Sequence, residues 1–126
     1  MTKNNIIERG DKMSDCLFCK IASGKTDTEI IYEDEKVVAF EDIKPKAPVH
    51  LLIVPKKHIP TLNNLEMKDK DLVGHIYQVA SALAEKKGIA QDGYRVVSNC
   101  NEDGGQTVFH VHFHLLGGRQ LQWPPG

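Results

Sequence analysis

Residues 110–116, with the sequence HVHFHLL, constrain the fold more than any other part of the chain. Histidines alternate there with apolar residues, and a period of two sends successive side chains of a β-strand to opposite faces. We therefore predict a strand with His110, His112 and His114 on one face and apolar side chains on the other. Histidine rings need partners for both nitrogens, so a row of three is poor core material. A catalytic or anion-binding face is favoured, with a metal-binding tract or a solvated face as alternatives.

The size and composition of the chain are those of one globular domain. Its 126 residues are 40% hydrophobic and 26% charged, which is enough apolar material for a buried core. The net charge of -1 and the lack of a long basic run argue against a nucleic-acid groove or an anionic membrane surface. The sequence contains no apolar stretch that approaches the length of a transmembrane helix. We expect residues 1–14 to be a disordered lead-in and residues 15–126 to form the domain.

The cysteines, Cys16, Cys19 and Cys100, indicate the redox setting. An odd number of cysteines in a chain that shows no export signal argues against a disulfide framework and favours a reducing, cytoplasmic compartment. The Cys16-x-x-Cys19 spacing is typical of half a metal site or of a redox pair. We expect Cys100 to be a packed free thiol.

Hydrophobic patterning predicts about five strands and one long helix. The expected strands cover residues 29–32, 36–42, 49–54, 93–99 and 110–116. The first two form a hairpin, and the last two are antiparallel neighbours joined by a turn at residues 101–107. A short helical turn is expected at residues 16–22, and a long helix is expected to begin at a cap on Asn63 or Asn64 and to end before Gly88. These elements define an α+β fold with an antiparallel sheet.

The turn before the histidine segment has the residues of a phosphate-binding loop. Gly104 and Gly105 carry no Cβ, so their backbone N–H groups can approach an anion closely. Thr107 adds a hydroxyl donor, and Asn99, across the predicted hairpin, adds an amide. A Gly-Gly pair is usually only a turn, but this one directly precedes the row of imidazoles. We therefore predict a phosphate site at this turn.

Histidines beside a phosphate site can catalyse phosphoryl or nucleotidyl transfer. A neutral imidazole attacks phosphorus and forms a covalent intermediate, which divides one displacement into two. Neighbouring donors stabilise the charge that develops on the non-bridging oxygens. His112 has a histidine on either side, so it is the candidate nucleophile, and His114 is expected to contact the phosphate. His50, at the start of another strand, is a candidate for relaying a proton or for donating to the phosphate.

The segment HVHFHLL matches the histidine triad pattern His-φ-His-φ-His-φ-φ, and the match extends over nearly the whole chain from Leu17. The further matching fragments are FEDI at 40–43, APVH at 47–50, VPKKHI at 54–59, GYR at 93–95, Asn99, GGQT at 104–107, GGRQ at 117–120 and WPPG at 123–126. The chain thus resembles the histidine triad (HIT) superfamily, and its ending resembles the Hint branch of nucleotide-binding proteins. This resemblance implies a HIT-like fold with a five-stranded antiparallel sheet, and a homodimer in which two sheets join into one of ten strands.

The Hint resemblance also implies an activity: hydrolysis of the P–N bond of adenosine 5′-phosphoramidate-type substrates to AMP. His112 would be the residue that becomes covalently nucleotidylated, with His114, His50 and Thr107 as further catalytic residues. The nucleotide-binding residues would be Leu17, Phe18, Ile21 and Phe40 around the base, Asp42 and Ile43 at the ribose, and Asn99, Gly105, Gln106, Thr107, His112 and His114 around the phosphate and leaving group. A dinucleoside polyphosphate hydrolase of the Fhit type and a non-catalytic nucleotide-sensing module are the alternatives.

A resemblance to the zinc-binding members of the superfamily implies a metal site. Its ligands would be Cys16, Cys19, His58 and His110, a Cys₂His₂ set that fills the tetrahedral coordination of a structural Zn²⁺ ion. Two reduced thiols or a redox pair are the alternatives for the cysteines. A zinc-bound His110 cannot also move protons, which would leave His112 and His114 for the chemistry.

Overall fold

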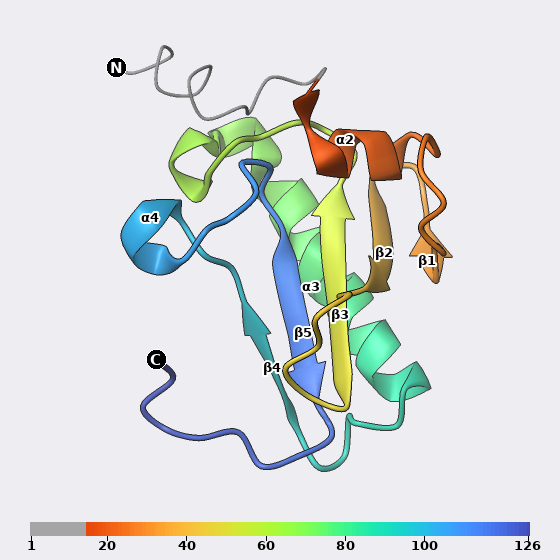
Figure 1. Ribbon diagram of the computed structural model, residues 1–126, viewed down its shortest axis with the longest axis vertical. Helices are drawn as coiled ribbons and strands as arrows, with labels where there is room; N and C mark the ends of the chain where they lie inside the picture. Colours follow the sequence, from red (N-terminus) through yellow and green to blue (C-terminus); the bar gives the residue numbers. More distant parts are fainter. Residues whose placement is uncertain (1–14) are drawn as a thin grey trace.

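A computed structural model describes residues 15–126, in which five strands form one antiparallel sheet (Figure 1). The strands follow the order β1-β2-β3-β5-β4 across the sheet. They are β1 (Tyr32–Glu33), β2 (Val37–Glu41), β3 (Val49–Pro55), β4 (Tyr94–Val97) and β5 (Phe113–Gly117). The α-helices are α2 (Leu17–Ala22), α3 (Lys70–Lys86) and α4 (Asn101–Gly104). The predicted α+β fold is confirmed, whereas the expected disordered lead-in, residues 1–14, lies outside the described residues.

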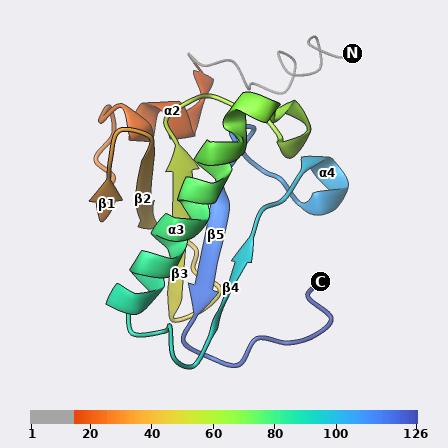
Figure 2. The same cartoon turned by 180° about the vertical axis from the view of Figure 1, so that it is seen from behind.

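The long helix α3 covers one face of the sheet and buries its apolar stripe there (Figure 2). Val79 and Leu83 share a buried cluster with Ile53 and Leu115 of the two central strands. Gly88, at φ 76°, takes the left-handed conformation that commonly follows a helix end, as the sequence predicts. Within residues 15–126, no helix is both long and apolar enough to cross a bilayer.

The opposite face of the sheet carries a second apolar cluster beneath the short helix α2. Phe18 and Ile21 of this helix are buried together with Phe40 and Leu52 of the sheet. Because side chains alternate along a strand, Leu52 faces α2 while its neighbour Ile53 belongs to the cluster under α3. Beside this second cluster, the same face of the sheet carries the histidine rings.

The histidine segment is a β-strand only in its second half, so the prediction of a strand over residues 110–116 is wrong at its start. β5 begins at Phe113, because its ladder with β3 ends at the pair of Ile53 and Phe113. Upstream, the backbone N–H of Val111 donates to the carbonyl of Ile59 instead of joining the sheet. The alternation nevertheless persists, since Val111 and Phe113 lie in the α3 cluster and the imidazoles gather on the opposite face.

The long helix starts at Lys70, later than the predicted cap at Asn63 or Asn64. Asn64 does act in a capping box, but with Thr61 around a separate 3-10 turn, η2 (Leu62–Asn64). Leu65 then takes an extended conformation with ψ 139°, which interrupts the helical backbone before a second turn, η3 (Met67–Asp69). The predicted cap of the long helix is therefore wrong: Asn64 is the third residue of η2, whose N-cap is Thr61, and α3 begins after Asp69.

The pairings of the outer strands agree with the sequence-based expectation. β1 pairs with β2 as a hairpin, and β4 lies antiparallel to β5. Both outer strands are shorter than the expected ranges 29–32 and 93–99. The connection at residues 101–107, expected to be a turn, contains the one-turn helix α4.

Candidate functional site

The ring of His112 is held in one tautomer by the backbone. Its Nδ1 lies 2.7 Å from the carbonyl oxygen of His110, which can only accept, so Nδ1 carries the proton and Nε2 carries the lone pair. Burial lowers the pKa of His112, which keeps the ring neutral. The edge of Phe18 packs on this ring with the centroids 4.9 Å apart, and Ser98 Oγ donates to the His112 carbonyl at 2.9 Å. A neutral imidazole with a free, fixed Nε2 has the state that a nucleophile needs.

His114 is oriented by a chain of hydrogen bonds that begins at a backbone amide. The N–H of Lys46 donates to His50 Nδ1 at 3.0 Å, so His50 Nε2 carries the proton. His50 Nε2 lies 2.9 Å from His114 Nδ1 and donates to it, which leaves the proton of His114 on Nε2. Burial, with added repulsion from His112 and His50, lowers the pKa of His114 to about 4. His114 is therefore a neutral ring that presents an N–H donor.

Asp42 lies beside this chain at the end of β2. Its Oδ2 is 3.5 Å from His50 Nε2, and its Oδ1 accepts the backbone N–H of Lys44 at 2.8 Å. Donor atoms of Asp42, His50 and His114 lie within 4.8 Å of one another, as in a metal site. The tautomer of His50 argues against a metal, because its Nε2 proton would have to be lost while Nδ1 still accepts from Lys46. These three residues therefore form a hydrogen-bonding group.

A cavity of about 760 Å³ opens over these residues. Asp42, His50 and His114 contribute to its wall together with Asn99 and Thr107, so the structure brings these five predicted residues together. The remaining wall combines basic and mainly apolar side chains: Lys44, Lys46, Arg95, Val97, Leu116, Arg119, Leu121, Gln122, Pro124 and Pro125. The cavity thus combines hydrogen-bonding side chains with basic and apolar ones.

Gln106 is placed differently from the other residues of the predicted phosphate loop. Its side chain is buried, and its Oε1 accepts the backbone N–H of Asn101 at 2.8 Å. Its Nε2 donates to the carbonyls of Pro60 at 2.7 Å and Val108 at 3.0 Å. The amide is fully used within the protein, so Gln106 shapes the loop that carries Gly105 rather than reaching into the cavity.

The residues expected around the base do not form one continuous surface. Phe18, Ile21 and Phe40 are buried in the cluster under α2, and the rings of Phe18 and Phe40 meet edge to face at 5.7 Å. Leu17 is 50% exposed and Ile43 is 92% exposed. Leu17 is therefore the one exposed residue of the four expected around the base, and Ile43, which is expected at the ribose, is exposed as well. The buried three would act by supporting the site from below.

The predicted metal ligands converge on one point. His110 Nδ1 lies 3.2 Å from Cys16 Sγ, 3.4 Å from Cys19 Sγ and 3.2 Å from His58 Nδ1, and Cys19 Sγ lies 3.2 Å from His58 Nδ1. His110 Nε2 donates to the carbonyl of Pro55 at 2.7 Å, which turns the lone pair of Nδ1 toward the cluster. Four soft donors at such separations suit a tetrahedral ion, so this cluster could hold a metal.

The electrostatics of the cluster fit the same conclusion. Burial and the neighbouring Cys16 side chain raise the pKa of the Cys19 thiol to about 12. Two thiolates side by side repel each other. The positive charge of a coordinated cation offsets that repulsion, so the thiols lose their protons when the cation binds. The donor set of two cysteines and two histidines therefore fits a divalent ion of the zinc type.

The cluster and the candidate nucleophile share parts of the chain. His110 contributes Nδ1 to the cluster and its carbonyl oxygen to His112. Phe18, which lies between the two cysteines, packs its ring against both His110 and His112. The cluster therefore fixes the backbone and the aromatic neighbour that hold the His112 ring.

Sequence reasoning missed several residues of this site. Ser98 holds the backbone of His112, and the N–H of Lys46 sets the tautomer of His50. Lys44, Arg95 and Arg119 line the cavity from three separate segments. Basic residues so far apart in sequence form no motif, and only the fold brings them to one place.

Comparisons with known proteins agree with the fold. A family model described as "Scavenger mRNA decapping enzyme C-term binding" matches residues 15–122. A purine nucleoside phosphoramidase of Escherichia coli (strain K12) is 47% identical over 105 residues, 83% of this chain and 88% of that protein. The structure of a HIT family hydrolase from Legionella pneumophila Philadelphia 1 is 52% identical, with a TM-score of 0.87, covering 88% of this chain and 99% of that one. A histidine triad protein from Clostridium difficile is 48% identical, with a TM-score of 0.83, covering 86% and 94%. The chain belongs to the HIT family.

Proposed function

We propose that this protein is a purine nucleoside phosphoramidase that hydrolyses the P–N bond of adenosine 5′-phosphoramidate-type substrates to AMP. The observation that carries the proposal is the fixed tautomer of His112, whose Nδ1 proton is bound by the His110 carbonyl so that Nε2 is free to attack. The E. coli relative at 47% identity bears the name of this activity, and the Legionella neighbour is called a hydrolase.

The reaction proceeds in two displacements at phosphorus. His112 Nε2 attacks, the P–N bond breaks, and the amine leaves with one proton taken up on its nitrogen. Water then attacks the nucleotidyl-histidine, which releases AMP, returns that proton and restores the neutral ring. The His114 Nε2–H and the Thr107 hydroxyl, which both line the cavity, stabilise the phosphate oxygens and pass the proton. His50 keeps His114 in the donor tautomer.

The remaining predicted residues bind the nucleotide in this proposal. Asn99 and the backbone around Gly105, which sits at φ 85° after α4, donate to the phosphate. Asp42 binds the ribose hydroxyls, with Ile43 beside it, and Leu17 supplies the exposed apolar contact to the base. The buried Phe18, Ile21 and Phe40 support this surface, and Gln106 braces the phosphate loop.

We further propose that Cys16, Cys19, His58 and His110 hold a structural Zn²⁺ ion. The ion would cross-link α2 to the histidine segment, and it would take no part in the chemical steps. Its thiolate ligands require a reducing compartment, so a cytoplasmic location is part of the proposal. A homodimer is included as well, because β4 lies at the edge of the sheet and a second copy could pair there to give ten strands.

Hydrolysis of adenosine 5′-phosphoramidate, followed as AMP release, tests the proposed activity. The protein should cleave this substrate with turnover, and His112→Ala should abolish the cleavage while AMP still binds. Cleavage by His112→Ala at the rate of the unmodified protein would remove the nucleophile from the proposal. Binding of AMP with no hydrolysis by either protein would favour the nucleotide-sensing alternative.

A further inference from the structure

The cavity beside His114 contains more positive charge than the bound nucleotide can neutralise. Lys44, Lys46, Arg95 and Arg119 line it, and Asp42 is the one carboxylate in its wall. Among residues 15–126, none of these four cations forms an ion pair with a carboxylate. An adenosine phosphoramidate brings a single negative charge at its phosphorus. Of the four positive charges, Asp42 and the phosphorus can neutralise one each, so two are left without a partner on the enzyme or on the nucleotide.

The two arginines are held in place by the backbone. Arg95 Nη2 donates to the carbonyl of Gln122 at 3.0 Å, and Arg119 donates to the carbonyls of Lys46 at 2.8 Å and Gln120 at 3.1 Å. A guanidinium has five N–H donors, so each arginine keeps donors for a ligand. Because these anchors fix the side chains beforehand, less conformational entropy is lost when an anion binds.

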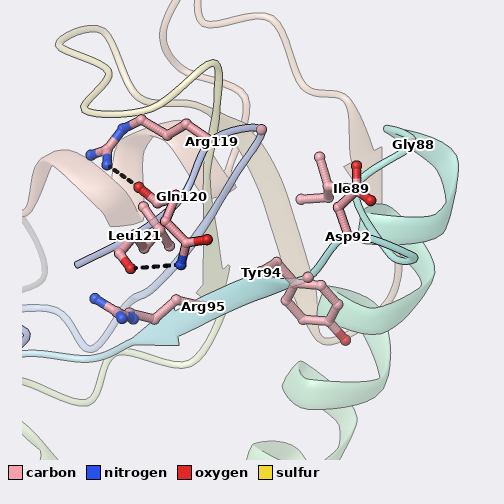
Figure 3. A pocket seen from close by; sticks show the side chains of 10 residues that line it. Gly88, Ile89, Asp92, Tyr94, Arg95, Arg119, Gln120 and Leu121 are labelled. Carbon is pink, nitrogen blue, oxygen red and sulfur yellow. Dashed lines mark hydrogen bonds between the residues drawn. The ribbon is translucent and has the colours of Figure 1, made fainter. Parts of the chain in front are cut away.

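A second cavity, of about 590 Å³, shares Arg95 and Arg119 with the first. In Figure 3 both guanidinium groups extend to the same side, away from Asp92 and Tyr94 at the other end of this second cavity. The one acidic side chain in its wall, Asp92, therefore does not neutralise the arginines. The free donors of the pair remain available to a ligand in the cavity of His114.

The apolar side chains of the first cavity indicate the kind of leaving group that it accepts. Val97, Leu116 and Leu121 line it alongside the four cations. A group that leaves the phosphorus into this cavity thus meets both apolar side chains and fixed positive charges. A neutral or cationic amine would leave these charges unpaired or repelled.

We propose that this enzyme selects phosphoramidates whose leaving group carries an anion, a carboxylate or a phosphate, which Arg95, Arg119, Lys44 and Lys46 bind. The inference rests on the proposed phosphoramidase function and adds the chemical class of the leaving group. Arginine presents a planar fork that matches both anions, so the shared chemistry is a bidentate oxyanion at the far end of the amine.

Three adenosine 5′-phosphoramidates that differ only at the remote end of the amine test this selection. The amines are 4-(aminomethyl)benzoate, its uncharged amide 4-(aminomethyl)benzamide, and the cationic 4-(aminomethyl)benzylamine, in which the reacting nitrogen keeps a similar environment. We expect kcat/KM to fall in that order. The ratio of benzoate to benzamide should also fall as salt is added, because salt screens exposed charges.

Two variants and one control locate the effect. Arg119→Gln and the double variant Lys44→Gln/Lys46→Gln should each lower the ratio of benzoate to benzamide, by about threefold to fivefold. The lysine side chains have no ion pair in the described structure, so the double variant keeps the fold even if Arg119→Gln disturbs the loops. Lys86→Gln, at the exposed end of α3 across the sheet, should leave the ratio unchanged.

The outcomes separate this inference from the function on which it rests. Cleavage of the benzamide substrate with a ratio near one, or a ratio that no variant moves, would overturn the anion selection and leave the phosphoramidase function standing. Failure to cleave any of the three substrates would overturn both. The adenosine 5′-phosphoramidate of 4-(aminomethyl)phenyl phosphate, which keeps the P–N bond and carries a phosphate at the remote end of the amine, serves as a fourth substrate. If its kcat/KM exceeds that of the benzoate substrate and falls in the same variants, the selected anion is phosphate.

Discussion

Replacing Gln106 by leucine should reveal whether this residue braces the phosphate loop or touches the ligand. The side chain is 6% exposed and makes hydrogen bonds of 2.8, 2.7 and 3.0 Å to Asn101, Pro60 and Val108. Each bond contributes about 1 kcal/mol net, and a buried group left without its partner costs about 1–3 kcal/mol. Leucine has a similar volume, so the loss of stability will reflect the missing hydrogen bonds and not a new cavity. We expect a loss of about 3 kcal/mol in the free energy of unfolding.

Urea unfolding at equilibrium measures that loss directly. For a domain of this size it corresponds to a fall in Tm of about 10 °C. Gln91→Leu, in the exposed turn before β4, is the matched control and should change the free energy of unfolding by less than about 0.5 kcal/mol. If Gln106→Leu instead kept its unfolding midpoint and lost only affinity for AMP, the bracing role would be refuted and a direct contact with phosphate restored.

The site and the metal cluster give three further predictions. His50→Phe should lower kcat about a hundredfold, because His114 loses the donor that sets its tautomer; stopped assays of AMP release would show this, and an unchanged kcat would refute it. The pKa of His114 is about 4 when folded, below the ordinary 6.5, so the unfolded chain binds the proton more readily and stability falls as pH drops from 6.5 to 4. Urea unfolding should show a loss over this range that is about 2 kcal/mol smaller in His114→Asn than in the unmodified protein, because the other buried histidines contribute in both. Protein purified without chelator should contain one zinc per chain by elemental analysis, and Cys19→Ser should lower both zinc content and Tm; a metal-free protein with the same Tm would contradict the zinc proposal.

The sequence was sufficient to predict the parts of the site that follow from strand geometry. Alternation in residues 110–116 correctly separated the imidazoles from Val111 and Phe113, which pack under α3. It could not predict where the ladder stops, because the N–H of Val111 donates to the carbonyl of Ile59, more than fifty residues away in the chain, instead of joining the sheet.

The tautomers of the histidines lay beyond any sequence pattern. They are set by the carbonyl oxygens of Pro55 and His110 and by the N–H of Lys46, none of which depends on a side-chain type. The same limit applies to Gln106, whose position suggests a ligand contact while its three partners come from the surrounding backbone.

The central claim is that His112 Nε2 forms a covalent bond to phosphorus. Rapid mixing with adenosine 5′-phosphoramidate, alkaline quenching and mass spectrometry of the digested protein test it most directly. We predict one nucleotidyl group on the peptide that contains residues 110–116, located on His112 and absent from His112→Ala. A nucleotidyl group on another residue, or turnover with no modified peptide at any time of quenching, would contradict the mechanism.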